Sequence, residues 1–393
     1  MAPKGLRVVA IICAAVVFAI LVVVYAGCKL LRRRTLPLAP ASDSESEATV
    51  EPTSSDGLRG KKSSSSEPLG IILATPDERA ARKVTNIYDD ILKATCNFSG
   101  ARIIGYGGFG TVYGGELPEG RRVAVKRLHG SFQFLCGRQF LAEMEAVAEV
   151  KHQNLVPLLG YCARGDERFL IYKRMRHGSL ASWLRNQANA ASQALGWPVR
   201  LEICLGSARG LVFLHHGFAS QHLTHRDVKS SNILLDELMR PRVSDFGLAR
   251  IIRGYETHVR TGDPGSLGYV PPEYPLAMKC TAKGDVYGFG VVMLEVLTGR
   301  PAAGQEVGEG GGELVGWVRW MVAHGREGEL FDPSLPVSGL WCEQMACVLD
   351  LALECTDDEP WKRPTMGRVV EELERIQLVE HGPYGLQGRE IQA

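Results

Sequence analysis

The side chains with the clearest chemical potential lie together in one short segment, His225 to Asn232. The segment reads H-R-D-V-K-S-S-N and matches the pattern H-R-D-x-x-x-x-N at every fixed position. Asp227 offers a carboxylate that can accept a hydroxyl proton, and Lys229 offers a cation for a phosphate in transfer. Asn232 offers an amide oxygen that can bind Mg²⁺. The segment therefore predicts phosphoryl-transfer chemistry.

A second acidic group follows a few residues later, in the run Ser244-Asp245-Phe246-Gly247. The carboxylate of Asp245 suits a Mg²⁺ ion that bridges two phosphates, and Phe246 can pack behind it. A lone D-F-G triplet is a common turn, but here it follows the first pattern closely. We therefore expect Asn232 and Asp245 to be the metal ligands.

A glycine-rich segment, Ile104 to Val112, reads I-G-Y-G-G-F-G-T-V and contains G-x-G-x-x-G. Glycines let backbone N–H groups approach phosphate oxygens without a side chain in the way. The same pattern serves dinucleotide-binding folds, and many glycine-rich turns hold no ligand. A dinucleotide fold needs a helix directly after the glycines, whereas Thr111, Val112 and Tyr113 favour a strand. We therefore expect a hairpin over nucleotide phosphates.

A lysine ends the apolar run Val123-Ala124-Val125-Lys126. An ammonium group on a buried strand is costly unless it is paired or bound to an anion, although a lysine at a strand end can also reach solvent. We expect Lys126 to hold the α and β phosphates and to pair with Glu143 on a downstream helix. Glu145 is the competing acid, but it lies about 200° around that helix from Glu143.

The elements that must position these residues follow from the apolar periodicity. Alternating short runs predict strands near 102–113 and 122–127, and longer helical patterns cover 138–150, 200–216 and 284–297. A strand-rich first part followed by a mostly helical remainder predicts an α+β fold. We place this domain at residues 87–378 and a C-terminal tail at 379–393.

An apolar run without charge or proline extends from Val8 to Ala26. At 1.5 Å per residue it spans roughly the 30 Å of a bilayer core, so we predict one transmembrane helix at 8–28. A cleaved signal peptide is the alternative, because small residues follow the run. Lys29 and the arginines at 32–34 outnumber the basic residues before it. The positive-inside rule then places residues 1–7 outside and the rest in the cytosol.

The segment 29–86 is predicted to be a disordered juxtamembrane linker, because 41–68 is rich in Ser, Glu, Pro and Gly and poor in large apolar residues. The whole chain has 45 Lys and Arg against 44 Asp and Glu, which gives no electrostatic reason to expect a nucleic-acid partner. Ten cysteines are scattered without paired spacings, which favours reduced thiols.

At this point the chain resembles the eukaryotic protein kinases and, within them, the plant receptor-like kinases, over about Ile87 to Leu378. Strings typical of that family are H-Q-N-L-V-P-L-L-G-Y-C at 152–162, D-V-K-S-S-N-I-L-L-D at 227–236 and G-D-V-Y-G-F-G-V-V at 284–292. The strings L-H-G at 128–130 and G-W-V-R-W-M at 316–321 resemble leucine-rich-repeat receptor kinases of the excess-microsporocytes type.

The resemblance implies a two-lobed fold, a small β-rich lobe before a larger helical one, and transfer of the ATP γ-phosphate to Ser or Thr hydroxyls of proteins with Mg²⁺ or Mn²⁺. It implies partner receptor-like kinases at the plasma membrane and no nucleic acid. It also implies that Asp285 anchors the catalytic loop and that Glu273 pairs with Arg363. The catalytic residues it implies are Asp227, Lys229, Lys126 and Glu143. The nucleotide contacts it implies are Gly105, Tyr106, Gly107, Gly108, Phe109, Gly110, Val112, Ala124, Lys126, Tyr172, Met175 and Leu234.

Several positions depart from the family. Lys173 and Arg174 stand where relatives carry an acid and an aromatic residue, and Ser266 replaces the usual threonine of the activation segment. Only about seven residues precede the predicted membrane helix, so we expect no ligand-binding repeats. Two interpretations follow: an active membrane-anchored Ser/Thr kinase, with Thr261 as the first candidate for regulatory phosphorylation, or a weakly active scaffold or decoy for full-length receptor kinases.

Overall fold

The computed structural model describes residues 69–72, 87–107, 110–129, 144, 150–185, 195–217, 223–246, 267–274, 281–304, 312–335 and 339–378. All of these residues belong to one compact unit, Ser64–Ala393. The predicted membrane helix at 8–28 lies outside these residues. None of the helices within them is both long enough and apolar enough to cross a bilayer.

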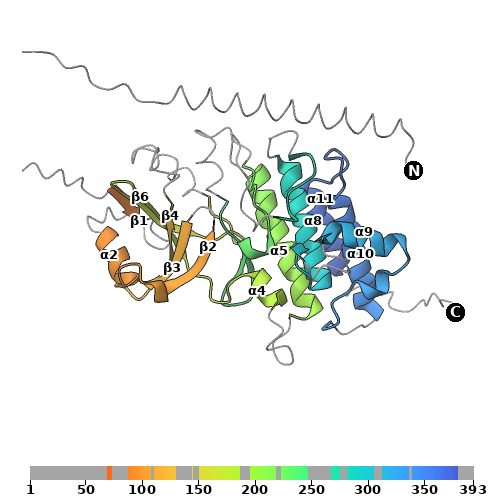
Figure 1. The fold of residues 1–393 in the computed structure, drawn as a ribbon, viewed down its shortest axis with the longest axis horizontal. Coiled ribbons are helices and arrows are strands. Elements are labelled where there is room, and N and C mark those ends of the chain that lie inside the picture. Colours follow the sequence, from red (N-terminus) through yellow and green to blue (C-terminus); the bar gives the residue numbers. More distant parts are fainter. Residues whose placement is uncertain are drawn as a thin grey trace, which may run out of the picture. The chain divides into compact units, whose positions relative to one another are not determined.

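A six-stranded antiparallel sheet forms the first lobe of the domain (Figure 1). Its strands are β1 (Leu69–Ile72), β2 (Ile103–Gly107), β3 (Gly110–Glu116), β4 (Arg122–Leu128), β5 (Leu158–Arg164) and β6 (Glu167–Lys173), in the spatial order β1-β5-β6-β4-β3-β2. The hairpin predicted from the glycine segment is confirmed as β2 and β3. Thr111, Val112 and Tyr113 belong to a strand, which excludes the dinucleotide-binding alternative.

Strand β1 corrects the predicted linker, which is wrong at its C-terminal end. Leu69 to Ile72 pair with β5 in the register Leu69↔Ala163 to Ile72↔Gly160. These four residues lie inside the segment 29–86. The sequence Leu-Gly-Ile-Ile is apolar and carries β-branched residues that favour a strand, unlike the polar 41–68 on which the linker was argued.

Helix α2 (Ile87–Ala94) covers part of the sheet. Its residues Ile87 and Ile91, one helical turn apart, are 1% and 0% exposed. They belong to a small core that the sheet supplies with Val123, Val125, Phe169 and Ile171. Packing against α2 therefore helps to hold β4, the strand that carries Lys126, in position.

The second lobe is mostly helical. It contains α4 (Leu180–Arg185), α5 (Trp197–His216), α8 (Ala282–Thr298), α9 (Leu314–Ala323), α10 (Gly339–Cys355) and α11 (Met366–Leu378). The helices predicted at 200–216 and 284–297 are confirmed as α5 and α8. The helix predicted at 138–150 lies largely outside the described residues, where only Met144 is assigned as helical.

Helix α8 is the centre of this lobe. Its residues are buried from Gly284 through Thr298, so the helix is covered on all faces and is mostly apolar, with Asp285 and Glu295 as its buried acids. Thr281 begins the helix by accepting a hydrogen bond from the N–H of Gly284, and Gly299 ends it with a left-handed φ of 68°. The short strands β7 (Ile233–Leu235) and β8 (Pro241–Val243) form a separate hairpin.

A buried tryptophan joins three helices of this lobe. Trp197 of α5 is 0% exposed and donates from Nε1 to Oε1 of Gln344 on α10 at 2.8 Å. The Nε2 of Gln344 donates in turn to the carbonyl of Ile376 on α11 at 3.1 Å. The amide of Gln344 therefore has a defined orientation between two helices.

Replacing Trp197 by Phe should lower the free energy of unfolding by about 1–3 kcal/mol, because the buried Oε1 of Gln344 loses its donor. Chemical denaturation followed by circular dichroism measures this loss. Trp361→Phe is the matched control, since Trp361 is 74% exposed and its replacement should leave stability nearly unchanged. Equal stability of the two variants would contradict a structural role for the Trp197–Gln344 bond.

Candidate active site

The loop that carries Asp227 is held from below by a carboxylate of α8. Asp285, 1% exposed, accepts hydrogen bonds from the backbone N–H groups of His225 at 2.7 Å and Arg226 at 2.6 Å. It also contacts Nε2 of His215 at 2.8 Å. Arg226 has a left-handed φ of 73°, a conformation that is costly for arginine and persists only where such bonds fix it. The predicted anchoring role of Asp285 is confirmed.

Asp227, Lys229 and Asn232 lie together in this loop. The Nζ of Lys229 is 2.9 Å from Oδ2 of Asp227. Asn232 donates from Nδ2 to the same Oδ2 at 3.0 Å and to the carbonyl of Asp227 at 2.9 Å. The side chain of Asp227 remains 24% exposed, so a hydroxyl from solvent can reach it. Lys229 and Asn232 orient the carboxylate, which stays partly exposed.

The segment after β8 brings Asp245 next to this loop. Ser244 donates from its N–H at 2.8 Å and from its hydroxyl at 2.9 Å to the carbonyl of Asn232. The Nε2 of His225 meets the carbonyl of Ser244 at 2.8 Å. Asp245 itself has a φ of 65°, again in the left-handed region. Two backbone carbonyls thus set the distance between the segments that carry Asn232 and Asp245.

Lys126 crosses from the sheet to this acidic residue. Its Nζ lies 2.7 Å from Oδ2 of Asp245, and its side chain is 3% exposed. Burial alone would raise the pKa of Asp245, but the charge and hydrogen bond of Lys126, together with the charges of His225 and Lys229, outweigh it and lower that pKa below its ordinary value. Asp245 is therefore a carboxylate at neutral pH. Glu143, the predicted partner of Lys126, lies outside the described residues.

The predicted metal ligands are suited to a hard cation. Nδ2 of Asn232 is engaged with Asp227, so Oδ1 is the atom able to meet an ion, and Asp245 supplies an ionised oxygen. Within the described ranges no group of three or more His, Cys, Asp or Glu side chains could enclose a metal by itself. Two protein oxygens fit Mg²⁺, which keeps ligand positions for phosphate and water.

The predicted nucleotide contacts lie on neighbouring strands. Val112 of β3 is opposite Lys126 of β4, and Ala124 of β4 is opposite Tyr172 of β6. Met175 follows β6 and belongs to the same apolar cluster as Tyr172, against which Ala124 and Leu234 pack. The glycine hairpin supplies the remaining described members, which are Gly105, Tyr106, Gly107 and Gly110. Gly108 and Phe109 lie outside the described residues.

Gly110 is required by the sheet itself. A Cβ at this position would lie 2.3 Å from the carbonyl oxygen of Arg127 on β4. Only glycine permits this approach of β3 to β4. Tyr106, in contrast, is 78% exposed at the outer side of the hairpin.

The predicted pair between Glu273 and Arg363 is confirmed. Arg363, 1% exposed, donates from Nη1 to Oε1 at 2.8 Å and from Nη2 to Oε2 at 2.7 Å. The two parallel bonds give the geometry that a guanidinium and a carboxylate prefer. The pair ties the segment 267–274 to the residues just before α11.

Glu273→Gln should lower the free energy of unfolding by about 3 kcal/mol, because it leaves the Arg363 guanidinium buried without its counter-charge. Glu329→Gln is the matched control. Glu329 also forms a bidentate pair, with Arg326, but at the surface. Exposed pairs contribute little, so denaturation should leave this control close to the wild type. A small effect for Glu273→Gln would show that carbonyl acceptors alone satisfy Arg363.

Sequence reasoning missed a buried network behind the catalytic loop. Glu295 of α8 is 0% exposed and accepts from Arg185 and from the hydroxyl of Tyr269. The hydroxyls of Tyr269 and Ser230 lie 3.0 Å apart. Burial raises the pKa of both Glu295 and Tyr269. One signal was available: Glu295 interrupts the apolar run Val291-Val292-Met293-Leu294 before Val296, where an acid requires a partner.

Comparison with known proteins agrees with this geometry. Residues 98–311 match the family described as protein tyrosine and serine/threonine kinase, which is more than half of the 393 residues. The chain therefore belongs to the protein kinase family.

Its relatives are receptor kinases of plants. The chain is 64% identical over 368 residues to the leucine-rich repeat receptor protein kinase MSP1 of Oryza sativa subsp. japonica, covering 94% of the chain and 28% of that protein. It is 47% identical over 315 residues to the leucine-rich repeat receptor protein kinase EMS1 of Arabidopsis thaliana, covering 80% of the chain and 26% of that protein. The chain thus spans little more than a quarter of these relatives.

A solved structure shares the fold. The pseudokinase domain of BIR2, an immune regulator of the RLK/Pelle family, superimposes with a TM-score of 0.66 and 36% sequence identity. The match covers 82% of this chain and 93% of that domain. The expected two-lobed architecture, a β-sheet lobe followed by a helical lobe, is confirmed.

Proposed function

We propose that this chain is an active, membrane-anchored protein Ser/Thr kinase that transfers the γ-phosphate of ATP to protein hydroxyls. One observation carries the proposal: direct contacts join Lys126 to Asp245 and join Lys229 and Asn232 to Asp227. The backbone of Ser244 connects the two groups through Asn232. These are the charged and polar groups that phosphoryl transfer needs in one place.

Each group has a separate task in this proposal. Asp227 orients the substrate hydroxyl and accepts its proton, and Lys229 neutralises charge on the phosphate in transfer. Lys126 binds the α and β phosphates, while Glu143 is proposed to hold Lys126 in place. Asn232 and Asp245 hold the divalent cation, which, when bound, neutralises charge on the β and γ phosphates.

The setting is proposed from the sequence and from the relatives. The apolar run within 8–28 and the basic residues at 29–34 support a single membrane span with the kinase domain in the cytosol. Relatives that are receptor kinases support the plasma membrane as the location. The proposed partners are protein substrates and other receptor-like kinases.

A weakly active scaffold is the second candidate, because the chain is similar to the pseudokinase domain of BIR2. An assay of phosphate incorporation distinguishes the two functions. The full chain is purified in detergent and then incubated with Mg²⁺ and labelled ATP. Asp227→Asn is the control for background. Incorporation well above that control, abolished by a chelator, supports the active kinase. Incorporation equal to the control would reject it in favour of the scaffold.

A further inference from the structure

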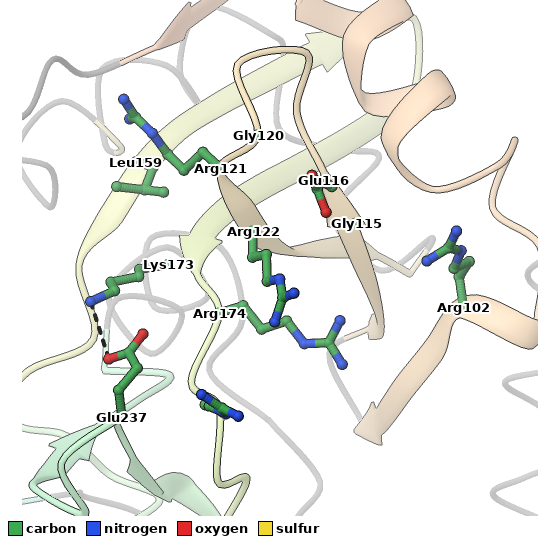
Figure 2. A pocket seen from close by; sticks show the side chains of 11 residues that line it. Arg102, Gly115, Glu116, Gly120, Arg121, Arg122, Leu159, Lys173, Arg174 and Glu237 are labelled. Atoms are coloured by element: carbon green, nitrogen blue, oxygen red, sulfur yellow. Dashed lines mark hydrogen bonds and ion pairs between the residues drawn. The ribbon is translucent and has the colours of Figure 1, made fainter.

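A hollow of about 840 Å³ lies on the outer side of the first lobe, beside the segment that joins the two lobes (Figure 2). The lining comes from the residue just before β2, the β3–β4 hairpin, β5, the end of β6 with the residues that follow it, and the β7–β8 turn. Its basic lining residues are Arg102, Arg121, Arg122, Lys173, Arg174 and Arg176. Six cations around one hollow form an unusually positive site.

Little negative charge offsets these cations. Glu116 and Glu237 are the two acidic residues of the lining, and Glu237 pairs with Lys173 at 3.4 Å. Among the residues that the structure describes, none of the five arginines forms an ion pair with an acid. Because the cations outnumber the acids, the like charges repel one another, and the site gains stability when an anion binds.

The geometry holds two of the arginines in place. The N–H of Arg174 donates to the carbonyl of Arg122 at 3.4 Å, which fixes their backbones side by side. Figure 2 shows their guanidinium groups pointing toward the same part of the hollow, with Arg102 reaching in from the other side. The guanidinium of Arg174 lies close to β3, where a Cβ at Gly114 would be 2.7 Å from Nη1.

We propose that this hollow is a docking site for a phosphorylated, acidic segment of a partner protein. Guanidinium groups present paired N–H donors that match phosphate oxygens, and clusters of arginine recognise phosphorylated motifs in other proteins. The volume exceeds what one phosphate ion fills, and the basic lining residues are spread over three chain segments, which suits a peptide. A hollow is also a poor match for a flat bilayer surface. The choice of ligand rests on the proposed function, whose product is a phosphorylated protein.

Fluorescence anisotropy with the full chain in detergent, without ATP, tests this proposal. The probe is a labelled peptide of Glu, Asp, Gly and Ser that carries two phosphoserines, compared with the same peptide without phosphate. We expect at least about tenfold tighter binding of the phosphorylated peptide, weakening as salt rises. Equal binding of the two peptides would overturn the proposal.

The triple variant Arg102→Gln, Arg122→Gln, Arg176→Gln should weaken binding of the phosphopeptide by at least tenfold. All three arginines are exposed, and the substitutions remove their positive charges. The matched control is Lys93→Gln, Lys151→Gln, Arg240→Gln. It removes the same charge from exposed positions outside the hollow and should leave binding unchanged. Equal losses in both variants would show a general charge effect and overturn the site. A melting curve for each variant confirms that it is folded.

Two further ligands test whether the site binds a phosphorylated peptide, a free polyphosphate or a lipid headgroup. Inositol hexakisphosphate and vesicles that contain anionic lipid are tested against the same pair of variants. Binding of either one that depends on the three arginines, without binding of the phosphopeptide, would overturn the peptide as the occupant. Because the binding assay contains no ATP, it does not depend on phosphate transfer. A chain that binds the phosphopeptide but shows no kinase activity would reject the proposed function and leave the docking site standing.

Discussion

Asp245→Asn should reduce the rate of phosphate transfer by about 10³-fold or more, while the protein stays folded. The variant loses the only negative charge that the described site offers to a divalent cation, and such a cation contributes several kcal/mol of charge stabilisation. It also leaves the buried Lys126 without the carboxylate that lies 2.7 Å away. Steady-state kinetics over a range of Mg²⁺ concentrations should show a loss that added metal restores only in part.

Asp236→Asn is the matched control for this experiment. Asp236 is a buried acid at the turn of the β7–β8 hairpin that accepts bonds from the N–H groups of Leu238 and Arg240, but it pairs with Arg242. This variant should lose stability without a change in the dependence on Mg²⁺. If both variants lost activity in parallel with stability, Asp245 would be a structural residue only.

Asp285→Asn should lower the turnover number by about 10²-fold and the free energy of unfolding by about 3 kcal/mol. The carboxylate of Asp285 accepts hydrogen bonds from the backbone N–H groups of His225 and Arg226. In the asparagine variant, the NH₂ group of the amide would face one of these N–H groups, and that bond would be lost. Bonds to a charged acceptor are worth about 1.5–3 kcal/mol each, and a misplaced Asp227 loses its alignment with the substrate. Denaturation curves and steady-state kinetics measure the two effects.

Asp332→Asn separates the two effects. Asp332 pairs with Arg200 at 2.6 Å and accepts from the N–H of Ser334 at 2.8 Å in the helical lobe. It should therefore lose stability to a similar extent but keep its turnover number. A catalytic loss in Asp332→Asn as large as that in Asp285→Asn would mean that loss of fold stability, rather than loop alignment, explains both.

The chemistry of the site could be predicted because each member lies in a short local pattern. Asp227, Asn232 and Asp245 are fixed by neighbours within a few residues or by one adjacent hairpin, so local sequence carries the information. The anchoring by Asp285 and the pair between Glu273 and Arg363 are long-range, and they followed from the family resemblance rather than from periodicity. From the residues alone, both could have been surface charges.

Other features depend on chain segments that only the fold brings together. The network of Glu295, Tyr269 and Arg185 joins residues far apart in sequence. An acid in an apolar helix indicates that a buried partner exists, but it does not identify that partner. Strand β1 escaped prediction because a four-residue edge strand is short and is selected by its pairing with β5. The arginines of the outer hollow come from three separate segments, none of which forms a motif by itself.

The ion pair between Lys126 and Asp245 connects a strand of the sheet to the helical lobe. In the proposed function, a phosphate that binds Lys126 competes with Oδ2 of Asp245, and a cation that binds this oxygen competes with the ammonium of Lys126. On this basis, the apparent affinity for nucleotide should be the affinity of the site with the pair broken, reduced by the free energy needed to break it. Nucleotide and cation should consequently bind with positive cooperativity, since the ligand that binds first breaks the pair for the second.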